Sequence, residues 1–184
     1  MAVLNLMSGS YQNCNAVACV IKYILRLGKN KDRENELMFW GGWGVPLYVQ
    51  REDIIASVVY VQEKWNIATR KGRRMFHETI TIGAYEFDDI GRDYFILKGI
   101  IDEYTYLAYF QHGFQVVYAV HWEPKKKLHV HFAVNTINYC NGKKWHTNKN
   151  ETKCREVLFN QIFSRHQSPI IFERSQYEKK ILCS

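Results

Sequence analysis

The segment FQVVYAVHWEPKKKLHVHFAVN, residues 114–135, contains two strongly apolar runs separated by a short basic loop. The runs predict two strands, Phe114–His121 and Leu128–Tyr139, and the loop is short enough for them to be antiparallel neighbours. Asn141-Gly142 follows, which is the strongest short signal for a hairpin turn, and Lys143–Trp145 can pair back. This segment therefore predicts part of an antiparallel sheet.

Three histidines stand on these two strands. Residues two apart on a strand point to the same face, so His129 and His131 project together, and His121 can lie beside them. Three imidazoles on one sheet face leave coordination positions open, which is typical of a catalytic metal site rather than a structural one. Glu123 is close enough to be a fourth ligand or to accept a hydrogen bond from an imidazole. A solvated loop carboxylate is the equal alternative for Glu123.

The rest of the chain alternates predicted strands and helices. Period-two and helical apolar patterns predict strands over Ala2–Leu6, Met75–Ile82 and Pro169–Phe172, and helices from Asn13 or Asn15 to about Leu27, over Glu52–Lys64, Asp89–His112 and Glu151–Ser164. Leu37–Val49 is rich in glycine and aromatic residues, which favours a loop or flap. The sum is an α+β fold, with helices packed on a mostly antiparallel central sheet, in a single domain over residues 1–184.

Composition favours a nucleic-acid partner. The formal net charge is +7, and basic residues cluster at Arg70–Arg74, Lys125–Lys127 and Lys143–Lys149. Aromatic residues make up 15% of the chain. Proteins that bind single-stranded nucleic acid use both aromatic and basic side chains, because bases stack on aromatic rings while phosphates pair with Lys and Arg. A solvated basic surface is the alternative reading of the charge alone. An odd count of five cysteines, with no signal peptide or membrane segment in view, predicts a cytoplasmic protein without membrane insertion.

The histidine segment resembles a known family. Val120–Asn135 is similar to the metal-binding motif of relaxases, the mobilisation endonucleases of the HUH group, and Asn141–His146 is similar to the Gly-Lys hairpin that often follows it. In that family the histidine pair and an upstream histidine hold the metal. Many relatives carry an acidic residue and a further histidine where this chain has Lys126 and Lys127. That departure leaves His121 as the third ligand by inference, with Glu123 as the fallback.

The resemblance also points to a nucleophile. VIKYILRLGK, residues 20–29, is similar to the tyrosine segment of the agrobacterial border-nicking relaxase and its relatives, in which Tyr23 matches the attacking tyrosine. A phenol can attack phosphorus and later leave, which a reversible strand transfer needs. We expect Tyr23 to face the histidine sheet from the first helix, with Lys22 and Arg26 along the path of the DNA. Without the resemblance, Tyr23 reads as a tyrosine packed on the core.

Other residues are candidates for contacts with the substrate, and a second tyrosine competes for the role of nucleophile. His77, Arg73, Arg74, Lys127, Lys143 and Lys144 are candidate DNA contacts, although packing is as good an explanation of His77. Tyr177 and Lys180 have the tyrosine and lysine spacing of rolling-circle replication initiators, and a charged carboxyl-terminal helix is the alternative there.

The resemblance implies a site- and strand-specific DNA endonuclease and transesterase. It implies single-stranded DNA at the transfer origin (oriT) of a plasmid or transposon as substrate, and a 5′-phosphotyrosine link through Tyr23. The implied cofactor is a divalent metal ion, Mn²⁺ or Mg²⁺ first, with Zn²⁺, Co²⁺ or Ni²⁺ compatible. Implied partners are an accessory DNA-binding protein and a type IV secretion coupling protein. The alternatives are a replication initiator that uses Tyr177 and a single-stranded nucleic-acid-binding module without catalysis.

Overall fold

The computed structural model describes residues 2–7, 11–48, 50–67, 71–122 and 128–166. Its centre is a five-stranded sheet in the order β1-β3-β5-β4-β2, and every pairing is antiparallel. The strands are β1 Val3–Leu6, β2 Leu37–Trp43, β3 Met75–Ile82, β4 Val116–His121 and β5 Leu128–Asn135. The predicted α+β fold with an antiparallel sheet is confirmed, and the predicted strand Ala2–Leu6 is present as β1, at one edge of the sheet.

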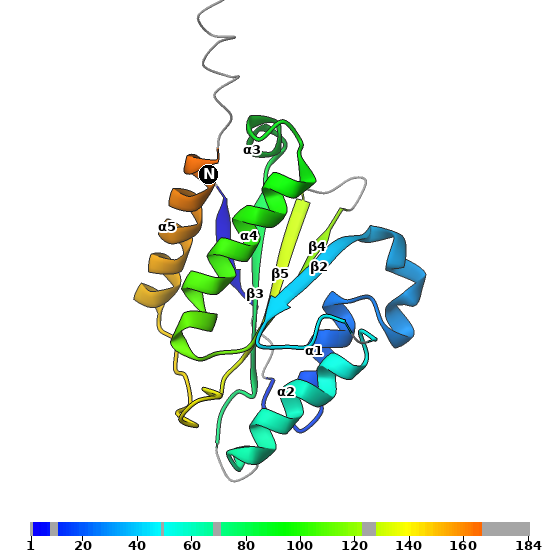
Figure 1. Ribbon diagram of the computed structural model, residues 1–184, viewed down its shortest axis with the longest axis vertical. Helices are drawn as coiled ribbons and strands as arrows, with labels where there is room; N and C mark the ends of the chain where they lie inside the picture. Colours follow the sequence, from blue (N-terminus) through cyan, green and yellow to red (C-terminus); the bar gives the residue numbers. More distant parts are fainter. Residues whose placement is uncertain (1, 8–10, 49, 68–70, 123–127, 167–184) are drawn as a thin grey trace, which may run out of the picture.

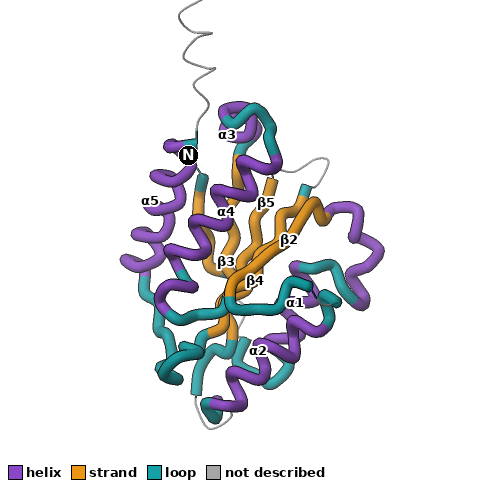
Figure 2. Tube along the Cα trace, in the orientation of Figure 1, coloured by secondary structure: helices purple, strands orange, loops and turns teal. Residues whose placement is uncertain are grey.

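Helices cover both faces of the sheet (Figures 1 and 2). The described helices are α1 Ala16–Ile24, α2 Asp53–Lys64, α3 Ala84–Asp89, α4 Tyr94–Ala108 and α5 Lys149–Arg165. The 3₁₀ segments η1 Gly28–Glu36 and η3 Phe110–His112 accompany them. Among the described residues, none of these helices has the length and apolar character needed to cross a membrane.

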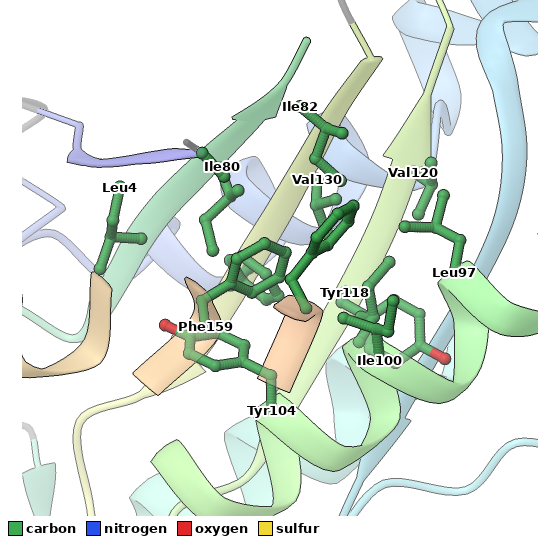
Figure 3. Close-up of a cluster of buried hydrophobic side chains, with 14 of the residues drawn as sticks. Leu4, Ile80, Ile82, Leu97, Ile100, Tyr104, Tyr118, Val120, Val130 and Phe159 are labelled. Carbon is green, nitrogen blue, oxygen red and sulfur yellow. The ribbon is translucent and has the colours of Figure 1, made fainter. Parts of the chain in front are cut away.

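The larger core lies between the sheet and the helices α4 and α5. Even-numbered residues of β5, such as Val130 and Phe132, point into it because side chains alternate along a strand. Tyr104 of α4 packs edge-on against Phe132 of β5 and against Phe159 of α5. Figure 3 shows Tyr104 and Phe159 beside the strand residues Ile80 and Val130 in this core. This face is packed mainly with apolar side chains, and none of the candidate metal ligands that the structure describes points to it.

A smaller core lies on the opposite face, under α1 and α2. Val17, Val20, Ile21 and Ile24 of α1 pack there against small residues of the central strands, including Ala119 and Ala133. Odd-numbered residues of β3, β4 and β5 point to this face, and His77, His121, His129 and His131 are all odd-numbered. The register of the sheet therefore directs four histidines toward α1.

The prediction of a loop or flap over Leu37–Val49 is wrong, because Leu37–Trp43 forms the edge strand β2 beside β4. Its glycines permit close packing rather than a turn. A Cβ atom on Gly41 would meet the ring of Tyr118, and one on Gly42 would meet the carbonyl oxygen of Val116. Glycine in this strand marks a close approach by its neighbour, which the sequence pattern alone does not distinguish from a loop.

The prediction of one long helix over Asp89–His112 is also wrong. The chain turns at Gly91 and Arg92, both with positive φ, and α4 begins only after Asp93, whose carboxylate accepts from the backbone N–H groups of Phe95 and Ile96. Other predicted elements are shorter than expected: the first helix ends at Ile24 and not near Leu27, and β5 ends at Asn135 and not at Tyr139. The predicted strand Pro169–Phe172 lies outside the described residues.

Candidate active site

The pairing of β4 with β5 places His121 directly opposite His129, and His131 is opposite Ala119. The ring centroids of His121 and His131 are 4.6 Å apart, and those of His129 and His131 are 6.4 Å apart. The structure thus brings together the three imidazoles that the sequence proposed as ligands. The short side chain of Ala119 leaves room on this face for the rings and for α1 above them.

His77 belongs to the same cluster, from the neighbouring strand β3. Its Nε2 lies 3.0 Å from Nδ1 of His131, and its Nδ1 lies 3.1 Å from the hydroxyl of Tyr11. His77 is only 3% exposed, so it cannot reach a phosphate in this conformation. The expectation that His77 contacts DNA is therefore replaced by an internal role, as a neighbour of His131.

Sequence reasoning missed Tyr11 altogether. It lies in a polar stretch with no periodic pattern, and long-range contacts bring it to β3: the Arg74 N–H donates to the Tyr11 carbonyl, and the Tyr11 hydroxyl contacts His77. Burial, and then the nearby Tyr23, raises the pKa of the Tyr11 hydroxyl, so this phenol stays protonated at neutral pH.

Burial keeps the clustered imidazoles neutral. Desolvation lowers the pKa of His77 to about 4 and, together with the positive charge of Arg26, that of His121 to about 4. Desolvation and the neighbouring histidines lower the pKa of His131 to about 2. Neutral imidazole is the form that binds metal ions, so all three are in the ligating protonation state at neutral pH.

Hydrogen bonds fix some of the ring nitrogens. His121 Nε2 lies 2.6 Å from the carbonyl oxygen of Ile24 in α1 and must donate to it, so His121 Nδ1 carries a lone pair. That Nδ1 is buried and has no hydrogen-bond partner among the described residues. His129 Nδ1 lies 3.2 Å from the hydroxyl of Thr81.

Tyr23 lies in the last turn of α1 with its ring over the cluster. Its centroid is 5.7 Å from that of His77 and 5.6 Å from that of His131, and both contacts are edge-on. The Tyr23 hydroxyl makes no hydrogen bond to a described residue. Since His121 is bonded to the end of the same helix, the tyrosine and the histidine face are held in one unit.

Arg26 is the clearest correction among the candidate DNA contacts. Its side chain is 0% exposed, and its guanidinium pairs with Glu36 at 2.7 Å, so it does not line the path of a strand. It lies instead 5.2 Å from the centre of the Tyr23 ring and donates to the Tyr23 carbonyl at 3.5 Å. Arg26 therefore holds Tyr23 in place from within the fold.

The remaining basic candidates lie on the surface. Lys22 and Lys143 are exposed, while Arg73, Arg74 and Lys144 are half-buried. Arg73 and Lys144 line one hollow with aromatic side chains, and the charge of Arg73 is near enough to Tyr11 to oppose part of the rise in the pKa of that phenol. The full lining of this hollow is Leu6, Gly72, Arg73, Phe76, Lys144, Trp145, His146 and Thr147. Glu123, Lys127, Tyr177 and Lys180 lie outside the described residues.

The histidines fit a divalent metal by chemistry, although they do not form a finished site. Within the part of the chain that the structure describes, no group of three or more His, Cys, Asp or Glu side chains is arranged to hold a metal ion. His121 nevertheless has a buried Nδ1 without a hydrogen-bond partner among the described residues, and its ring lies beside that of His131. Nδ1 of His131 is bonded to His77, which leaves its Nε2 as the second available ring nitrogen. Two available imidazole nitrogens, with His129 beside them, suit Mn²⁺, Zn²⁺, Co²⁺ or Ni²⁺.

A tyrosine packed over a histidine-lined sheet, in a basic α+β domain, defines a candidate phosphodiester-cleaving enzyme. Residues 23–167 match a family model described as "Relaxase: MobA/VirD2-like, nuclease domain". The match covers most of the chain and includes Tyr23 and all four clustered histidines, and the chain therefore belongs to this family of DNA-nicking relaxases. A comparison with curated proteins gives no match.

Proposed function

We propose that this domain nicks one strand of DNA at the transfer origin of a mobile element, with Tyr23 as nucleophile. The observation that supports this most directly is the packing of Tyr23 against His131, on the sheet face that also carries His121 and His129. In-line attack needs the phenol oxygen about 3 Å from the phosphorus, so a rigid tyrosine above the phosphate site is the required arrangement.

The chemistry balances as a transesterification. The phenol oxygen of Tyr23 forms a bond to phosphorus while the bond from phosphorus to the 3′ oxygen breaks. The phenol loses its proton to solvent, and the departing 3′ oxygen gains one. The products are a 5′-phosphotyrosine and a free 3′ hydroxyl, and the reverse reaction rejoins the strand.

The protein contributes position and charge. The guanidinium of Arg26 lies against the Tyr23 ring, and the bond from His121 to Ile24 ties the end of α1 to the sheet. We propose His121, His129 and His131 as ligands for a divalent metal ion, which when bound would polarise the scissile phosphate. Arg73 and Lys144 are proposed to pair with phosphates of the strand next to the site.

The test is covalent capture. The purified domain is incubated with Mn²⁺ and single-stranded oligonucleotides from the transfer origin of its own element, then analysed by denaturing electrophoresis. The wild type and Tyr177→Phe should give a protein band shifted by DNA, whereas Tyr23→Phe should fold, bind DNA about as well and give none. An adduct that survives Tyr23→Phe and disappears in Tyr177→Phe would establish a replication initiator instead. Binding without an adduct under any metal condition would indicate a non-catalytic module.

A further inference from the structure

Three side chains form a continuous hydrogen-bonded relay that leads away from the proposed metal site. Nδ1 of His131 contacts Nε2 of His77 at 3.0 Å, and Nδ1 of His77 contacts the hydroxyl of Tyr11 at 3.1 Å. His77 and His131 are 3% and 8% exposed, so water competes poorly for either ring. Tyr11 precedes the segment matched by the relaxase family, which begins at residue 23. The outer end of the relay therefore lies outside the matched segment.

The direction of this relay controls the tautomer of His131. A neutral imidazole has one N–H donor and one acceptor nitrogen, so each ring must donate on one side and accept on the other. If His131 Nδ1–H donates to His77, then His77 Nδ1–H donates to Tyr11, and the lone pair of His131 is on Nε2. If instead Tyr11 donates to His77 Nδ1, then His77 Nε2–H donates to His131 Nδ1. His131 then carries its proton on Nε2, and this nitrogen cannot bind a metal.

We propose that Tyr11 is a positioning residue for the metal centre: it accepts the Nδ1–H of His77, so that His77 can accept from His131 and leave the His131 Nε2 lone pair for the metal. The proposal rests on the proposed function, because it assumes that His131 is a ligand. Partners of this kind orient ligating histidines in metal sites generally, and their loss costs about 10- to 100-fold in metal affinity.

The hydroxyl of Tyr11 matters because an unpaired buried N–H is worse than an unpaired buried acceptor. Without the hydroxyl, His77 loses the acceptor for its Nδ1–H and is better satisfied with its proton on Nε2, donating to His131. That change forces His131 into the tautomer that cannot bind. Tyr11→Phe retains the ring and its packing, so the variant removes only the acceptor.

The first measurement is metal affinity, by calorimetric titration of the domain with Mn²⁺ and Zn²⁺ in the absence of DNA. Tyr11→Phe should weaken binding by about 10-fold. Tyr60→Phe is the matched control, because this exposed tyrosine on α2 should leave the affinity unchanged. Equal affinity of Tyr11→Phe and the wild type, within about 2-fold, would overturn the proposal.

A double-mutant cycle separates the relay from a structural role. In His77→Gln, the amide oxygen accepts from His131 whatever Tyr11 does, so affinity should be largely kept, and adding Tyr11→Phe should then have almost no effect. His77→Leu offers no acceptor and should bind weakly with either residue at position 11. Additive effects of Tyr11→Phe and His77→Gln would show that Tyr11 acts through packing, which contradicts the relay.

Nitrogen-detected spectra of the zinc-loaded domain, labelled with ¹⁵N-histidine, report the protons directly. His77 and His131 should each carry the proton on Nδ1, and a His77 proton on Nε2 would refute the direction proposed. The covalent-capture assay distinguishes the two levels of failure. A wild type that forms the adduct while Tyr11→Phe binds metal normally leaves the nuclease intact and removes only the relay. A wild type that neither binds metal nor forms an adduct removes both.

Discussion

His121 and His129 are direct partners across β4 and β5, and both side chains point to the sheet face beneath α1. His121 is fully buried and bonded to α1, whereas His129 is half-exposed at the same level of the sheet. A ligand bound between them would therefore be reached from one side only. Under the proposed function, an incoming phosphate would therefore reach the half-exposed His129 first.

Removing either His129 or His131, the two histidines on β5, should abolish cleavage but leave DNA binding largely intact. We expect His129→Ala and His131→Ala to abolish the covalent adduct while the affinity for a single-stranded oligonucleotide changes less than about 3-fold, because charge pairing dominates binding. Parallel electrophoresis and anisotropy titrations measure both. Loss of binding together with cleavage would mean that the histidines support the DNA groove rather than the reaction.

The stability of the metal-free domain should fall as the pH falls from about 6.5 toward 4. The folded pKa values of His77 and His121 are lowered to about 4, and that of His131 to about 2, so the unfolded chain binds protons that the folded chain refuses. The stabilisation is fully present above the unfolded pKa and is lost below it, by up to about 1.4 kcal/mol per pH unit for each histidine. Urea titrations at several pH values measure the slope. His77→Gln should reduce the slope by one proton, and an unchanged slope would show that His77 titrates normally.

DNA binding should weaken as salt rises, with a log–log slope of about −0.7 for each phosphate contacted by the single strand. Arg73→Ala should make the slope shallower, because this side chain lines the basic hollow. Arg92→Ala is the matched control, since Arg92 is exposed on the turn before α4 and pairs with Asp88. Equal changes in both variants would indicate a diffuse effect of net charge.

Arg26→Ala should destabilise the domain by about 3 kcal/mol, because it removes a fully buried charge that pairs with Glu36. Adduct formation should fall even where the variant is folded, since the Tyr23 ring loses its contact with the Arg26 guanidinium. Metal affinity should change little. The alternative is that loss of an ion pair with Glu36 is by itself enough to reduce adduct formation. Arg33→Ala tests it, because Arg33 also pairs with Glu36.

Gly41→Ala should cost about 1–3 kcal/mol, because its Cβ would push on the ring of Tyr118, whose hydroxyl donates to Asp102 at 2.6 Å. Gly99→Ala in α4 meets nothing within 4 Å and should stabilise the helix by about 0.5–1 kcal/mol. Chemical denaturation compares the two. Equal effects would show that β2 is not packed as closely as described.

The sequence predicted the histidine strands because their apolar runs and the two-residue spacing of the HxH pair are local properties. It could not show that β3 pairs with β5 in the register that places His77 beside Ala133 and within reach of His131, because register depends on contacts between distant segments. For the same reason, the sequence did not point to Tyr11, and Arg26 was predicted to lie on the surface when it is buried. A basic residue next to the candidate tyrosine reads as a DNA contact until the fold shows it pairing with Glu36.

The order of strands in the sheet means that the proposed site cannot form until β5 has been synthesised. β5 lies in the middle of the sheet but is the last of the described strands to leave the ribosome, and it carries His129 and His131. Until residue 135 has emerged, β3 and β4 have no strand between them and Tyr23 has no imidazole of β5 to face. A chain that ends before residue 135 therefore lacks the proposed site, and under the proposed function it could not cut DNA.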